Sequence, residues 1–98
     1  MTRLEIYRRL HGWTHAELGK RIGRTQPQVV RYCKPRSDPG HNMPQWPVGD
    51  ALKALTHGVI DLGNYADELT PAEAAEMMAE IARREADASA AASKVPHG

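Results

Sequence analysis

Apolar residues in the first third of the chain recur at the three- and four-residue spacing of amphipathic helices. Ile6 and Leu10 are four residues apart with Tyr7 beside them, and Leu18 and Ile22 repeat the spacing. Side chains at this spacing lie on one face of a helix, where they can be buried together. The pattern predicts short helices packed on one another, and therefore an all-α fold.

Three of these helices begin with the same capping signal, a threonine followed three positions later by Glu or Gln. In such a pair, each side chain can bind the other residue's backbone amide. The pairs are Thr2 with Glu5, Thr14 with Glu17, and Thr25 with Gln28. Gly12 and Gly23 are the expected ends of the first two helices, because glycine adopts the left-handed conformation without strain.

A proline-rich loop is expected after the third helix. Residues 34–47 contain four prolines and one glycine, which no regular helix would accept. We expect Trp46 to attach this loop to the body by burying its ring; the alternative is an exposed aromatic side chain that serves a partner. Apolar residues between 48 and 56 then predict a fourth helix, and residues 64–69 are expected to add another helical turn.

A longer amphipathic helix is expected near the C-terminus. Thr70, Pro71 and Glu73 mark its start, because proline favours the first helical position and the acid faces the positive end of the helix dipole. Its thin apolar stripe comprises Ala74, Met77, Met78, Ile81 and Ala82. The helix is expected to end near Asp87.

The 98 residues are enough for one compact domain with an appendage. We expect about five short helices over residues 1–69, the C-terminal amphipathic helix over 70–87, and a disordered tail over 88–98.

Charge is distributed very unevenly, although the net charge is only +1. Residues 1–36 hold nine basic and two acidic residues, giving +7, whereas residues 37–98 hold four basic and ten acidic residues, giving −6. A basic third of this kind predicts attraction to a polyanion such as nucleic acid, while the acidic remainder is repelled from it.

Several classes of protein find no support in the sequence. Cys33 is the single cysteine, so no internal disulfide can form, and no apolar run approaches the ~20 residues of a membrane-spanning helix. The N-terminus lacks the apolar region of a signal peptide, and we expect a cytoplasmic protein. Glycine-rich phosphate loops, serine elbows and paired buried carboxylates are missing, so we expect neither an enzyme nor a cofactor.

The spacing of the metal-ligating residues does not indicate a metal site. His11 and His15 are four residues apart, but Gly12 interrupts the helix that would align them. Cys33 and His41 follow without a recognised ligand motif. Cys33 falls on the inward face of the third helix, where we expect it to act as a small apolar residue.

Residues 14–33 match the physical requirements of a helix-turn-helix. Two short capped helices are joined by a brief turn that contains a glycine. Gly19 lies where the two helices are expected to cross, and its lack of a side chain lets the backbones approach. The expected inward positions are Leu18, Ile22, Val29 and Tyr32.

The segment THAELGKRIGRTQPQVVRYC, residues 14–33, resembles the XRE family, the Cro-type helix-turn-helix regulators. A weaker likeness extends over residues 3–67. The resemblance implies a lambda-repressor-like domain and a bacterial or phage transcriptional regulator that binds double-stranded DNA as a homodimer in the nucleoid. A repressor is favoured over an activator, because repression needs only occupancy of a promoter. Two residues depart from the family pattern: Gly19 replaces the usual alanine, and Arg24 occupies a place that is often apolar.

The resemblance also implies that the helix over residues 26–33 enters the major groove. The amide of Gln26 suits the N6 and N7 edge of adenine, and the guanidinium of Arg31 suits O6 and N7 of guanine. Pro27 can pack on a thymine methyl group. Gln28 and Val30 are lesser candidates, since Gln28 also has a capping role.

Contacts to the DNA phosphates are expected around the same two helices. The expected contact residues are His15, Arg24, Thr25, Lys34 and Arg36. Arg8, Arg9, Lys20 and Arg21 are second-tier candidates, with a merely solvated surface as the alternative.

A second hypothesis is a protein-interaction module, such as an antitoxin or adaptor, that acts mainly through the helix over residues 71–87. Its methionines and alanines could pack on the domain, pair in a dimer, or contact another protein such as RNA polymerase. Salt dependence separates the hypotheses, because binding to DNA weakens steeply with salt whereas an apolar contact hardly changes.

Overall fold

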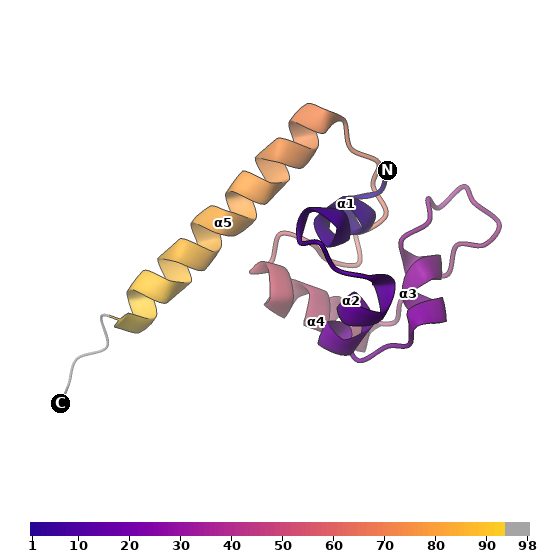
Figure 1. Cartoon of the computed structure of the whole chain (residues 1–98), viewed down its shortest axis with the longest axis horizontal. Coiled ribbons are helices and arrows are strands. Elements are labelled where there is room, and N and C mark those ends of the chain that lie inside the picture. The colour runs from indigo at the N-terminus through magenta and orange to yellow at the C-terminus, as the bar shows by residue number, and fades with distance from the viewer. Residues whose placement is uncertain (94–98) are drawn as a thin grey trace.

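The part of the chain that the structure describes folds into five helices connected by turns and loops (Figure 1). The computed structural model describes residues 1–93. The helices are α1 (Arg3–Leu10), α2 (His15–Ile22), α3 (Gln26–Tyr32), α4 (Trp46–Thr56) and α5 (Pro71–Ser93). Residues 1–93 contain no strand, and extended pairing among them is limited to an isolated bridge between Thr2 and Glu68. The predicted all-α fold is confirmed.

The predicted reciprocal cap is present at the start of α2, but only half of it is present at the start of α1. The Thr14 hydroxyl accepts from the Glu17 N–H at 3.1 Å, and the Glu17 carboxylate accepts from the Thr14 N–H at 3.1 Å. At α1 the Thr2 hydroxyl accepts from the Glu5 N–H at 3.3 Å, but the Glu5 carboxylate turns to arginines one turn later. The reciprocal cap predicted at α1 is therefore wrong, because charged partners at i+3 and i+4 take up the carboxylate.

The elements between α3 and α5 differ from the prediction at two boundaries. Helix α4 begins at Trp46 rather than at residue 48, with Pro47 in its first turn, a position that proline tolerates. Residues 64–69 form no regular helix. A turn at residues 62–66 overlaps the start of this range, and in it the Asp61 carbonyl accepts from the Tyr65 N–H at 3.0 Å. Residues 1–69 therefore contain four helices rather than about five.

Helix α5 extends beyond its predicted end at Asp87 and continues to Ser93. Residues 88–93 were expected to be disordered, but alanine, the strongest helix former, occupies most of these positions. The remainder of the predicted tail, residues 94–98, lies outside the described residues. No helix of the described part has both the length and the apolar character needed to cross a membrane.

One hydrophobic core joins all five helices and the segment between α4 and α5. Its fully buried large side chains include Leu4, Tyr7, Leu18, Val29, Leu52, Ile60 and Tyr65. Met77 and Ile81 add the first half of α5 to this core, and the Arg84 guanidinium donates to the His57 carbonyl at the end of α4 at 2.8 Å. The second half of α5 runs away from the body (Figure 1).

Two residues expected inside are exposed. Leu10 is 59% exposed because it ends α1, where it lines a surface groove with Ile6 instead of being covered. Trp46 is 71% exposed, which contradicts the prediction that its ring attaches the loop. The loop is held instead by His41, whose ring lies 2.7 Å from the Lys34 carbonyl on one side and 2.7 Å from the Tyr65 hydroxyl on the other.

Candidate nucleic-acid interface

Helices α2 and α3 are joined by a tight turn that begins at Gly23. Gly23 has a left-handed φ of 72°, and the next amide, that of Arg24, donates to the Gly19 carbonyl at 2.8 Å. A Cβ atom on Gly19 would lie 2.4 Å from the Arg24 carbonyl oxygen and 3.3 Å from Val29 Cγ2. The backbones therefore approach too closely for any side chain at this crossing, which gives a physical reason for glycine at this position.

The residues predicted to face inward from the two helices are buried. They are Leu18, Ile22, Val29, Tyr32 and Cys33. Their contacts with the core fix the orientation of α3, so its opposite face is presented by a rigid scaffold rather than by a loop.

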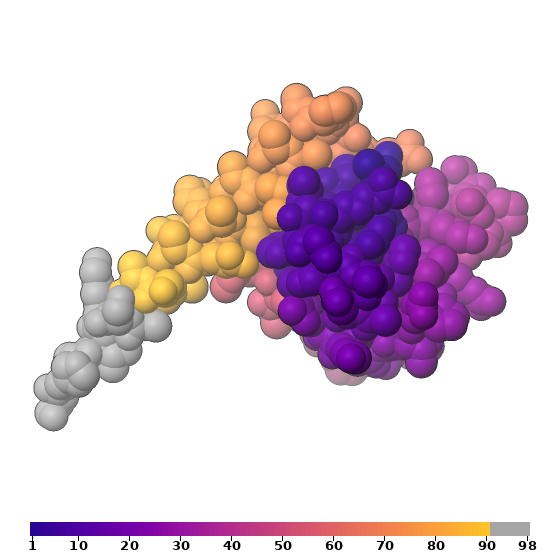
Figure 2. All heavy atoms as spheres, viewed as in Figure 1, coloured from indigo at the N-terminus to yellow at the C-terminus, as the bar shows by residue number. Residues whose placement is uncertain are grey.

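The predicted base-reading residues lie on the exposed side of α3. Gln26, Pro27, Gln28 and Arg31 are exposed, and Val30 is half-buried. Gln28 Oε1 accepts from the Thr25 N–H at 3.0 Å and from the Thr25 hydroxyl at 3.1 Å, so its amide group remains as a donor. Helix α3 and the loop after it lie on the side of the molecule away from α5, as Figure 2 shows in purple and magenta.

The residues predicted to contact phosphates differ in how far other groups of the protein already bind them. Thr25 is exposed at the start of α3, and Arg24 is half-buried with its guanidinium donating to the Gly23 carbonyl at 3.0 Å. Lys34 is half-buried over Gly40. Arg36 lies 3.1 Å from the Asp67 carboxylate, but both side chains are about half exposed. This ion pair is therefore weak, and another anion can replace Asp67 as the partner of Arg36.

Part of the basic charge in residues 1–36 is neutralised within the protein. Arg8 and Arg9 both pair with Glu5, and Arg8 also donates to the Trp13 carbonyl at 2.6 Å. Burial alone would raise the pKa of Glu5, but the hydrogen bonds from these arginines outweigh it and lower the pKa. Arg8 is therefore held within the protein and is not merely solvated, which was the alternative to a phosphate contact.

Arg21 takes part in an aromatic stack that the sequence did not indicate. Its guanidinium lies 4.0 Å from the centre of the Trp13 ring, which in turn stacks on His11 at 4.4 Å. The contact holds Arg21 at the surface beside α2, with its charge still accessible.

A cluster of three metal-ligating side chains was also missed. Donor atoms of Glu5, His15 and Cys33 all lie within 4.8 Å of one another. They come from α1, from the first residue of α2 and from the end of α3, so no sequence spacing relates them. One related prediction followed from the sequence, the inward position of Cys33.

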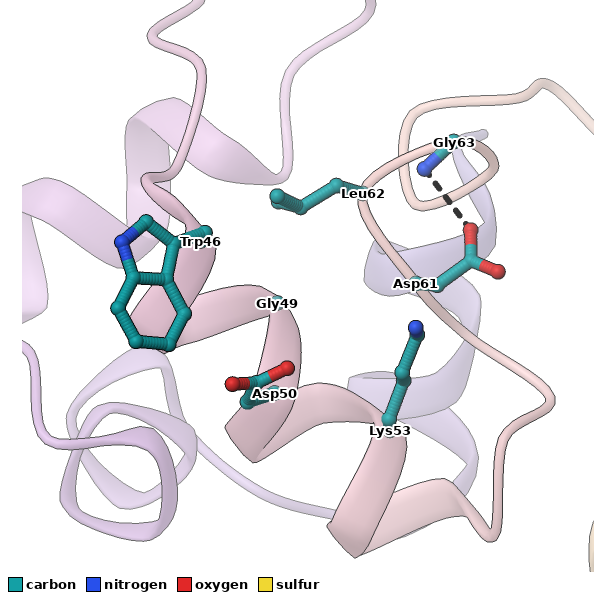
Figure 3. Close-up of a pocket in the computed structure, with 7 residues that line it drawn as sticks. All are labelled: Trp46, Gly49, Asp50, Lys53, Asp61, Leu62 and Gly63. Carbon is teal, nitrogen blue, oxygen red and sulfur yellow. Dashed lines mark hydrogen bonds between the residues drawn. The ribbon is translucent and has the colours of Figure 1, made fainter.

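A shallow pocket lies between α4 and the turn at residues 61–63 (Figure 3). Leu62 packs over Gly49, and the Asp61 carboxylate accepts from the Gly63 N–H at 2.8 Å and from the Asn64 N–H at 3.1 Å. Both hydrogen bonds end on Oδ1, so this oxygen stabilises the turn. Trp46 lines the rim of the pocket.

Comparisons of the chain with models of protein families, with curated proteins and with solved structures find no match.

Proposed function

We propose that the protein is a sequence-specific regulator of transcription with a lambda-repressor-like domain, which reads double-stranded DNA by inserting α3 into the major groove. The proposal is supported by the way α2 and α3 pack together. A glycine crossing and buried inward residues hold α3 rigidly, while Gln26, Pro27 and Arg31 remain exposed on its outer side. Rigid presentation of a few polar side chains is what recognition of base edges requires.

The proposal assigns base reading to Gln26 and Arg31, with Pro27 and Gln28 beside them. Arg24, Thr25, Lys34 and Arg36 contact phosphates, and His15 adds a contact at the start of α2. Repression is favoured over activation, because occupancy of a promoter needs no further surface. The proposed protein acts by binding rather than catalysis. Burial, followed by the charge of Glu5, raises the pKa of the Cys33 thiol to about 12, so this thiol is a poor nucleophile.

The test begins with selection of the preferred site from random duplexes, followed by measurement of affinity for that site and for unrelated DNA. Gln26→Ala and Arg31→Ala are each expected to weaken binding to the selected site by about 1–3 kcal/mol with little change on unrelated DNA. Arg83→Ala is the matched control, since it removes an exposed arginine from α5. Equal losses on both DNAs would refute the base-reading assignment.

Lys34→Ala should instead weaken binding to all sequences and reduce the salt dependence, as expected for a phosphate contact. A homodimer should select an inverted repeat with half-sites about one turn, or ~34 Å, apart.

A second candidate function is protein interaction through α5. It is favoured by one observation, the exposure of the second half of this helix beyond its contacts with the core. Binding of a protein such as RNA polymerase through this segment would be nearly independent of salt, whereas the DNA affinity proposed above falls steeply as salt rises.

A further inference from the structure

Three different helices bring a carboxylate, an imidazole and a thiol together beside α3. Glu5 lies on α1, His15 is the first residue of α2, and Cys33 follows the last residue of α3. Their donor atoms lie within 4.8 Å of one another. Cys33 is only 5% exposed, and the other two side chains are half-buried.

The two oxygens of the Glu5 carboxylate have separate roles. Oε1 accepts from Arg8 Nε at 3.0 Å and from Arg9 Nε at 3.0 Å, whereas Oε2 lies 3.3 Å from His15 Nε2. Arg8 is itself anchored by the Trp13 carbonyl. Carboxylates that bind metals are commonly oriented in this way, with one oxygen toward the ion and the other held by hydrogen bonds.

We propose that Glu5, His15 and Cys33 form a binding site for a single divalent transition-metal ion of the Zn²⁺ class. Sulfur and nitrogen donors with one carboxylate select such ions over Mg²⁺ and Ca²⁺, which prefer oxygen. Metal–ligand bonds of about 2.0–2.3 Å require the three donor atoms to move somewhat closer together. A surface pocket lined by all three residues leaves a fourth coordination position accessible to water or another small ligand.

Binding of the metal ion displaces a proton from the site. As a ligand, His15 binds the ion through the Nε2 lone pair of a neutral imidazole, whose proton is then on Nδ1. The Cys33 thiol loses its proton to solvent and binds as a thiolate, so one proton is released for each ion bound. With the Glu5 carboxylate and the thiolate, the divalent ion is neutralised, and Arg8 and Arg9 keep their bonds to Oε1.

Metal binding is tested with the purified full chain and Co²⁺ as a spectroscopic probe, followed by displacement with Zn²⁺. The expected result is one ion per chain, a thiolate-to-cobalt charge-transfer band, and visible bands of four-coordinate cobalt that Zn²⁺ removes. A folded protein that shows no thiolate-to-cobalt band would overturn the proposal.

Variants assign the ligands. Cys33→Ser should abolish the charge-transfer band, and His15→Gln should weaken Co²⁺ binding at least tenfold. His57→Asn is the control, because it removes an exposed imidazole far along the chain and asparagine tolerates the left-handed backbone at this position. Because Cys33 is buried and its variant could fail to fold, the half-exposed His15 carries the test independently; unchanged binding in His15→Gln would overturn the site.

A bound ion would also engage a residue assigned to the DNA phosphates, and this consequence rests on the proposed function. His15 cannot ligate a metal ion and contact a phosphate through the same nitrogen, so Zn²⁺ is expected to weaken DNA binding several-fold in the wild type and not in His15→Gln. Unchanged DNA affinity with Zn²⁺ bound would overturn this coupling. Absence of all DNA binding would instead refute the proposed function, while the Co²⁺ titration still decides the metal site.

Discussion

The hydroxyl of Thr2 donates a hydrogen bond to the backbone carbonyl of Cys33 at 2.7 Å, inside the protein. The residue that begins α1 is thereby joined to the residue that ends α3, 31 positions later. Both residues are buried, so neither group can turn to water if the bond is lost. This bond helps to define where α3 lies on the body.

Thr2→Val should lower the free energy of unfolding by about 1–3 kcal/mol, because it leaves a buried carbonyl without its donor and removes a helix cap. Urea denaturation followed by circular dichroism measures the loss. Thr2→Ser keeps the hydroxyl and is the matched control. A Thr2→Val protein as stable as Thr2→Ser would show that the bond contributes nothing.

Gly19→Ala should destabilise the protein, although alanine favours a helix by roughly 1 kcal/mol over glycine. The new Cβ would lie 2.4 Å from a backbone oxygen of the α2–α3 turn, and the turn must shift to relieve the clash. We expect a net loss of about 1–3 kcal/mol, with weaker DNA binding because α3 moves with the turn. Lys20→Ala, at the neighbouring exposed position, is the control for stability. A more stable Gly19→Ala protein would contradict the close crossing.

Met77→Ala should lower the free energy of unfolding by about 2–5 kcal/mol, since Met77 is 4% exposed and belongs to the common core. Met78→Ala, at a half-buried position, should lower the free energy of unfolding by less. Thermal and urea unfolding of both variants should each show one transition. Separate unfolding of α5 at lower denaturant concentration in the wild type would refute its membership of the core.

Glu80 should titrate well below its ordinary range. Hydrogen bonds from Arg83 and Arg84 lower the pKa of its carboxyl to about 2. Because the pKa is depressed in the folded state, the stabilisation is present above pH 4.5 and is lost as the pH falls toward 2. Titration by nuclear magnetic resonance measures the pKa, and Arg83→Gln combined with Arg84→Gln should return it toward 4.5. A wild-type pKa near 4.5 would show that these arginines do not hold the carboxylate.

Local signals in the sequence account for α2 and α3 almost completely. The capping pair of Thr14 and Glu17, the left-handed Gly23 and the inward residues at three- and four-residue spacing all act within one or two helical turns. Such interactions are encoded by neighbours in the chain and can be recognised without the fold. The exposed residues of α3 follow from them, because the inward face of a short helix determines its outward face; their assignment to DNA bases belongs to the proposed function.

Other features depended on what the fold brings opposite each residue. Glu5 has the spacing of a cap, yet it binds Arg8 and lies against His15, because charged groups near it compete better for its carboxylate. Trp46 has the chemistry of a buried anchor but remains exposed, since His41 holds the loop in its place.

The helix-turn-helix pattern over residues 14–33 was thus determined by the sequence itself, through caps, a turn glycine and helical periodicity. Only the tertiary structure decided that Thr2 and Glu5 would meet Cys33 and His15. Those contacts join residues from different helices, and their formation depends on how complete helices pack rather than on any interval along the chain.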